Sequence, residues 1–160
     1  MRVLRVFNRQ KSRSVNVALL RQVAKHLLEK SRARHDYELA VHLIDATEMA
    51  NINETFLGHS GSTDVITFDH KESAENEGLR GELFISVDDA VTQAHEFKQT
   101  WPSEIVRYVA HGVLHLEGYD DLQPAARRRM KREENKLVKD LSRQFDLGKL
   151  ARVKDVSGYK

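Results

Sequence analysis

The sequence predicts an α+β fold in which a mixed sheet of about four strands packs with about five helices. Apolar residues recur at every second position in short segments such as residues 37–44, which is typical of strands. They recur at spacings of three and four in longer segments such as residues 17–31, which is typical of helices. With 160 residues, of which 40% are hydrophobic, the chain can bury one core. We expect a single domain over residues 1–145, followed by a basic, weakly structured C-terminal tail over residues 146–160.

The first elements are a strand, a helix and a second strand. Residues 3–7 are mostly apolar and indicate a strand, although their alternation is imperfect. Asn16 can cap a helix over residues 17–31, because its apolar positions form one face while the outer face is basic. Residues 37–44 alternate with a period of two, so one face of this predicted strand is apolar.

The middle of the chain predicts a short helix and a hairpin. Thr47 begins the helix. Its inward-facing residues are Met49, Ile52 and Phe56. Residues 63–68 and 81–86 then indicate two strands, joined by a charged loop of low apolar content. Because this connection is too short for a helical crossover, we expect the two strands to pair as an antiparallel hairpin with a long loop.

Two further helices follow the hairpin. Either Ser86 or Asp88 caps the first of them, which runs to about Phe97. Ser103 caps the second, after an interruption at a Trp-Pro pair. Residues 105–116 are apolar on most sides of this second helix, so we expect it to be buried.

Basic residues gather at both ends of the chain. Pro124 suits the first turn of a last helix, whose outer faces are rich in Arg and Lys. Its inner stripe consists of Met130, Leu137, Leu141 and Phe145. The net charge is +9 over residues 1–35, −14 over residues 36–121 and +7 over residues 122–160, within a total of +2. The basic ends are either solvated helix faces or surfaces that contact a polyanion.

The composition excludes several classes of protein. No apolar run approaches the roughly 18 residues of a membrane-spanning helix, so we expect no membrane partner. Charges interrupt the apolar residues of the N-terminus, which is unlike a signal peptide. The chain contains no cysteine, which excludes disulfides and thiolate metal sites. We therefore expect a cytoplasmic protein in which any metal ion is held by histidines and carboxylates.

Two histidines four residues apart lie in the apolar run of the fourth predicted helix. His111 and His115 share one helix face, with Cβ atoms roughly 6 Å apart, so both imidazoles can bind one ion. Gly118 can end the helix in the left-handed conformation. The returning chain then brings Asp120 or Asp121 to the ion as a third ligand. Neutral imidazoles with one carboxylate suit zinc best, with nickel and manganese as alternatives.

The same segment is similar to two known signatures. Metzincin peptidases have a glutamate after the first histidine as general base, whereas this chain has Gly112, which argues against a peptidase. The chain instead resembles the YbeY-type endoribonucleases, whose signature is His-Gly-x-Leu-His-Leu-x-Gly-Tyr-Asp-His. Residues 111–120 match this signature, and only Asp121 differs from it. Two further motifs of that family correspond to residues 63–68 and 81–86.

This resemblance implies a central metal-bearing helix and one zinc ion held by His111, His115 and Asp121. It implies a single-strand-specific, metal-dependent endoribonuclease that acts in ribosomal RNA maturation, at the 3′ end of the small-subunit RNA, and in ribosome quality control. The implied partners are ribosomal RNA and the small ribosomal subunit. The general base is unassigned. Asp64 and Glu117 are candidates, and for Asp64 we favour the alternative of a hydrogen bond where its strand begins.

Two positions depart from the family pattern. Asp121 replaces a histidine, so the charge of the loaded site falls from +2 to about +1 and the bound water should be less acidic. Leu57 stands where the family usually has an arginine, so a phosphate-binding donor is missing. The candidates for holding the RNA backbone are Arg9, Lys11, Arg13, Arg127, Arg128, Arg129 and Arg132. The alternative function is a non-catalytic ribosome-assembly factor that binds RNA and contains a structural metal ion.

Overall fold

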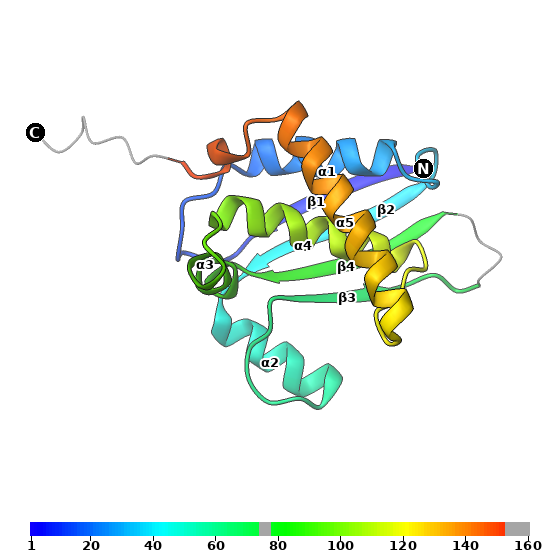
Figure 1. Cartoon of the computed structure of the whole chain (residues 1–160). Coiled ribbons are helices and arrows are strands. Elements are labelled where there is room, and N and C mark those ends of the chain that lie inside the picture. Colours follow the sequence, from blue (N-terminus) through cyan, green and yellow to red (C-terminus); the bar gives the residue numbers. More distant parts are fainter. Residues whose placement is uncertain (74–77, 153–160) are drawn as a thin grey trace, which may run out of the picture.

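The structure, a computed structural model, describes residues 1–73 and 78–152 and consists of a four-stranded sheet with helices on both faces (Figure 1). Its elements are β1 (Arg2–Asn8), α1 (Val17–Glu29), β2 (Tyr37–Ile44), α2 (Ala46–Leu57), β3 (Val65–Asp69), β4 (Leu79–Ser86), α3 (Val87–Glu96), α4 (Trp101–Leu116), α5 (Pro124–Gln144) and the 3-10 helix η1 (Leu147–Leu150). This confirms the predicted α+β class. None of the described helices is long and apolar enough to cross a membrane.

The sheet is mixed, with the strand order β1-β2-β4-β3. β2 pairs in parallel with both β1 and β4, and β3 pairs antiparallel with β4, which confirms the predicted hairpin. Side chains alternate between the two faces of a strand, so Leu39, Val41 and Leu43 of β2 all point to one side. They join Leu83 and Ile85 of β4 in the main apolar core.

Helices cover the two faces unequally. α1 and α4 pack on the face that carries the main core, and α5 packs on α4 (Figure 1). α2 lies on the opposite face, where Ile44, Met49 and Ile66 form a second, smaller core. The predicted burial of the fourth helix is confirmed, because most residues of α4 are buried.

A glycine lets α4 lie directly against the sheet. A Cβ atom at Gly112 would collide with the side chain of Leu83. Leu83 is fully buried in a close-packed core, so it has no free space into which to move. The close contact between α4 and β4 sets the position of the two histidines on α4, which line a cleft beside β3.

Some helix starts differ from the predictions. Asn16 caps α1 and Ser86 caps α3, as predicted. The predicted cap at Ser103 is wrong: Thr100 caps α4, and its side chain accepts a hydrogen bond from the Ser103 backbone N–H. Proline is tolerated in the first turn of a helix, where its missing N–H has no helical partner, so the Trp-Pro pair lies inside α4.

The predicted start and inner face of the short helix also need correction. α2 begins at Ala46, one residue before the predicted Thr47, and its cap is Asp45, whose side chain accepts a hydrogen bond from the Glu48 backbone N–H. Met49 is buried, as expected, but Phe56 is 67% exposed. α2 covers only part of its face of the sheet, and the Phe56 ring lies at the margin of that contact, edge-on to Phe68.

The main core extends past the predicted end of the domain. Leu150 is fully buried, and Leu147 lies beside it in the core with α1 and α4. Val15 forms a β-bridge with Ala151, which ties this segment to the start of α1. The expectation of a weakly structured tail is therefore wrong for residues 147–152, because two leucines three positions apart give η1 an apolar face. Residues 153–160 lie outside the described part of the chain.

Candidate metal centre

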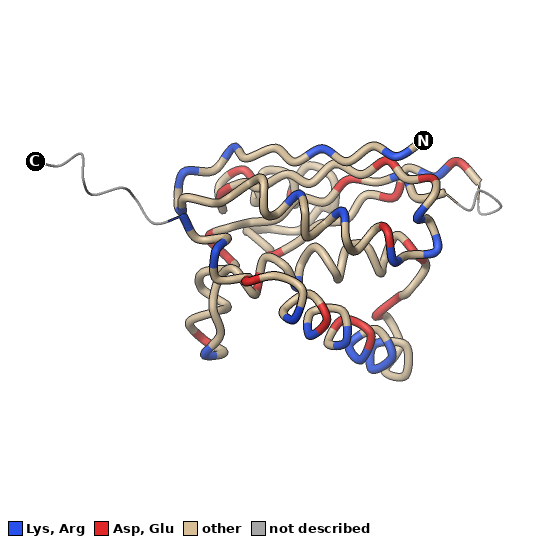
Figure 2. Tube along the Cα trace, turned by 90° about the horizontal axis from the view of Figure 1, so that it is seen from above, with Lys and Arg blue, Asp and Glu red and all other residues tan. Residues whose placement is uncertain are grey.

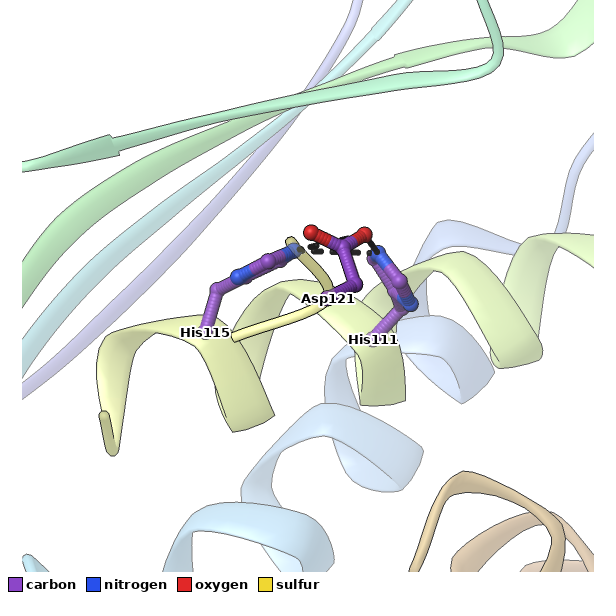
Figure 3. Close-up of side chains that lie close together, drawn as sticks. All are labelled: His111, His115 and Asp121. Atoms are coloured by element: carbon purple, nitrogen blue, oxygen red, sulfur yellow. Dashed lines mark hydrogen bonds and ion pairs between the residues drawn. The ribbon is translucent and has the colours of Figure 1, made fainter. Parts of the chain in front are cut away.

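His111, His115 and Asp121 bring three ligand atoms together at one point (Figure 3). The two Nε2 atoms lie 3.1 Å apart. The Asp121 Oδ2 atom lies 3.9 Å from the Nε2 of His111 and 3.7 Å from that of His115. Tetrahedral zinc with bonds of about 2.0–2.2 Å separates its ligand atoms by roughly 3.3 Å. The three distances therefore differ by at most about 0.6 Å from the spacing that one zinc ion requires.

Local geometry places the third group. Gly118 has φ of 104°, in the left-handed region, and ends the helical path after α4. The Tyr119 N–H donates to the Leu114 carbonyl, which turns the chain back over the last helical turn. Asp121 then reaches the two imidazoles, whereas the Asp120 carboxylate accepts a hydrogen bond from the Leu122 N–H within the turn. Of the two aspartates that the sequence left open, Asp121 is the one beside the histidines.

Both imidazoles are oriented by a second partner on their other nitrogen. The Nδ1 atom of His111 lies 2.8 Å from a carboxylate oxygen of Glu134. The Nδ1 atom of His115 lies 3.1 Å from the Tyr119 carbonyl oxygen. Since both partners are acceptors, each Nδ1 carries the hydrogen and each neutral ring presents its Nε2 lone pair to the cleft. Two lone pairs and a carboxylate then converge, an arrangement that a metal cation satisfies.

Glu134 is a buried carboxylate held by three donors. Its side chain is 6% exposed and also accepts hydrogen bonds from Arg107, at 2.7 Å, and Lys131, at 3.2 Å. Burial alone would raise the pKa of Glu134, but the hydrogen bonds from His111 and Arg107 and the charge of Lys131 outweigh burial and lower the pKa to about 2. Glu134 is therefore ionised at neutral pH and acts on the metal site through His111.

Glu134 was not among the residues singled out from the sequence. A usable signal was present, because Met130, Glu134, Val138 and Leu141 form the buried stripe of α5 at helical spacing. An acidic side chain in such a stripe must find buried partners. The sequence alone does not show that this partner is His111, which lies 23 positions away on another helix.

The three groups lie in a cleft of about 770 Å³, which we call the metal cleft. Leu57 and His59 line it, so the position where the family usually has an arginine faces the candidate metal site. Asp64 also lines it, and its carboxylate accepts a hydrogen bond from the Val65 N–H at 2.8 Å, where β3 begins. From the sequence we favoured such a hydrogen bond at the start of the strand over a role of Asp64 as general base. Glu117, the other candidate base, does not line the metal cleft.

The seven basic candidates for RNA binding lie outside the lining of the metal cleft. Arg9 is paired with Glu48, and Lys11 and Arg13 are exposed in the loop after β1. Arg127 is the candidate tied to the metal loop, since its Nε donates to the Asp121 carbonyl oxygen. The other three, Arg128, Arg129 and Arg132, are exposed on α5.

Comparisons with known proteins agree with this arrangement. The family model described as "Endoribonuclease YbeY" matches residues 5–142. An "Endoribonuclease YbeY" of Salinibacter ruber is 33% identical over 133 residues, which is 79% of this chain and 84% of that protein. Another from Syntrophotalea carbinolica is 33% identical over 150 residues, 91% of this chain and 99% of that protein.

A solved structure has the same fold. The solution structure of TM1509 from Thermotoga maritima superposes with a TM-score of 0.62 at 26% identity, covering 87% of this chain and 89% of that one. The family model and the full-length relatives together span the sheet, α4 and the three converging side chains. The chain therefore belongs to the YbeY endoribonuclease family.

Proposed function

We propose that this protein is a metal-dependent, single-strand-specific endoribonuclease that matures the 3′ end of the small-subunit ribosomal RNA and acts in ribosome quality control. The observation that carries the metal dependence is the convergence of His111, His115 and Asp121 in the metal cleft. Membership of an endoribonuclease family supports RNA as the substrate. In this proposal the partners are ribosomal RNA and the small ribosomal subunit, and the protein acts in the cytoplasm.

Zinc is the metal that suits these donors best, because neutral imidazoles and one carboxylate are its common ligands. When bound, such an ion would supply Lewis-acid chemistry towards a phosphoryl group and towards water. The ligands would be His111, His115 and Asp121. Glu134 and the Tyr119 carbonyl hold the two rings in the orientation that presents Nε2 to the cleft.

The basic residues of α5 would hold the RNA backbone. Figure 2 shows many Lys and Arg along this helix, with Asp and Glu between them. Arg127 begins the row at the metal loop, and Arg128 and Arg132 continue it on exposed positions. Phosphate contacts of this kind give affinity that depends on salt and not on base sequence. The α5 surface thus supports backbone binding next to the metal cleft.

A second candidate function is a non-catalytic ribosome-assembly factor that binds RNA and contains a structural metal ion. Leu57 favours it, because an apolar side chain lines the metal cleft where the family usually has an arginine. A guanidinium at this place would bind a phosphate oxygen, and leucine offers no donor.

One experiment separates the two candidates. Wild-type protein and the His115→Ala variant are purified without chelator, analysed for metal and incubated with a labelled single-stranded fragment of ribosomal RNA. We expect about one equivalent of zinc and cleavage for wild type, and loss of both in the variant. His95→Ala, an exposed histidine on α3, is the control and should behave as wild type. Equal cleavage by wild type and His115→Ala would indicate a contaminating nuclease, and RNA binding without cleavage would favour the assembly factor.

A further inference from the structure

A second cavity adjoins the metal cleft beside His111. It has a volume of about 470 Å³ and is lined by residues of α3, α4 and α5. Asp64, Val65 and His111 line both cavities. A ligand that lies over the candidate metal site can therefore extend from the cleft into this space. We call it the Glu104 cavity, after the acidic residue in its wall.

Two buried polar groups, Glu104 and Tyr108, lie four positions apart on α4 in the wall of the Glu104 cavity. Glu104 is 8% exposed, and its carboxylate has no ion pair with any residue in the described part of the chain. Burial raises the pKa of Glu104 and outweighs the charge of Arg107 and the neighbouring Tyr108 hydroxyl, both of which lower it. Tyr108 is 5% exposed, and its hydroxyl has no hydrogen-bond partner among the described residues. Buried polar groups are nearly always satisfied, so the Tyr108 hydroxyl indicates a ligand that completes the cavity.

The rest of the wall offers amides and an aromatic ring. Gln93 and Gln99, which carry side-chain amides, line the cavity, and so does Phe97, which is 61% exposed. Arg107 and Lys131 also line it, but both donate to Glu134 and their charge is partly balanced. The free groups are thus hydrogen-bonding atoms and an aromatic face, which is the combination that binds an unstacked nucleobase.

We propose that the Glu104 cavity binds the nucleobase next to the cleaved phosphodiester, and that the Glu104 carboxylate selects guanine by accepting hydrogen bonds from its N1–H and N2 amino group. The proposal rests on the proposed ribonuclease function, because that function places the RNA backbone over the metal cleft. Phe97 would stack on the base, and the amides of Gln93 and Gln99 would bond to its remaining polar atoms.

Guanine fits a carboxylate better than uracil does. Its Watson–Crick edge presents two adjacent donors to the two oxygens of Glu104, whereas uracil presents one donor between two carbonyl oxygens, which an acceptor-only carboxylate repels. Adenine and cytosine offer one amino donor each. Bidentate pairs of this kind discriminate between bases by about tenfold or more.

The test uses uridine oligonucleotides that carry one central guanosine, inosine or uridine. Cleavage rate and position are measured, together with affinity by fluorescence anisotropy, so the base preference is read even if the protein binds without cutting. We expect wild type to prefer guanosine over uridine by about tenfold. Inosine lacks the N2 amino group, so it should lose most of that preference. This comparison needs no protein variant and does not depend on how a mutant folds.

Glu104→Gln should bring guanosine and inosine to parity, because an amide accepts through only one oxygen. Glu29→Gln on the exposed surface of α1 is the matched control and should keep the guanosine preference. Equal affinity and cleavage for all three oligonucleotides by wild type would overturn the proposal. Full retention of zinc by His115→Ala would instead refute the proposed metal-dependent function, so the two failures are distinct.

Discussion

Replacing Glu134 by glutamine tests whether this buried carboxylate supports the metal site through His111. The substitution keeps the size of the side chain and removes its charge. The ionised carboxylate accepts from His111, Arg107 and Lys131, and a neutral amide accepts through one oxygen only. Loss of such a partner to a metal-binding histidine typically weakens metal affinity roughly 10- to 100-fold. We expect a decrease of this size in zinc affinity for Glu134→Gln.

The same variant should also be less stable without metal. The pKa of Glu134 is lowered from 4.5 to about 2, which corresponds to about 3 kcal/mol of stabilisation at neutral pH. Because the folded-state pKa is depressed, this contribution is present above pH 4.5 and is lost as the pH falls towards 2. The difference in unfolding free energy between wild type and Glu134→Gln should therefore shrink over that range.

The assay combines competitive zinc titration against a chromogenic chelator with urea unfolding of the metal-free protein, followed by the fluorescence of Trp101. Glu133→Gln is the control, since Glu133 pairs with a lysine whose side chain is 74% exposed. It should change stability by no more than about 0.5 kcal/mol. If Glu134→Gln binds zinc as tightly as Glu133→Gln, the reasoning that Glu134 orients His111 is refuted.

Three other predictions follow from the site and the core. Asp121→Ala should lower the bound zinc measured by elemental analysis, and Asp120→Ala should not; the reverse result would make Asp120 the third ligand. Leu57→Arg should increase the affinity for single-stranded RNA in a salt-dependent way, because it restores a donor in the metal cleft. Phe56→Arg adds the same charge at an exposed position outside the cleft lining, and an equal gain there would contradict the assignment. Leu150→Ala should lower the unfolding free energy in urea by about 2–5 kcal/mol, because its side chain is fully buried; a change below about 0.5 kcal/mol would show that the η1 segment does not pack in solution.

Local periodicity was sufficient for most of the fold. Each strand and helix buries one face, so its spacing of apolar residues is visible in the sequence. Two of the wrong predictions were the cap at Ser103, where two residues can cap the same helix, and the burial of Phe56, which depends on the extent of the sheet. Ser103 and Thr100 can both cap a helix, and the choice depends on whether the proline lies before or within the first turn. Phe56 follows the helical spacing of α2, but the sheet beneath does not extend far enough to cover it.

The sequence by itself determined the pair of histidines, because a spacing of four on a helix places both rings on one face whatever else the chain does. It also determined the turn at Gly118 that allows an aspartate to return to them. It left the choice between Asp120 and Asp121 open, since adjacent residues in a loop differ only in the direction in which the folded backbone points them.

Only the tertiary structure decided what surrounds the histidines. Glu134 reaches His111 because α5 packs on α4, a contact between residues far apart in the chain that no local pattern encodes. The same packing, together with α3, encloses the Glu104 cavity and leaves the buried Tyr108 hydroxyl in its wall without a hydrogen-bond partner among the described residues. The ligands of the candidate metal site are thus local in origin, while their orientation and the adjoining cavity come from how the helices pack.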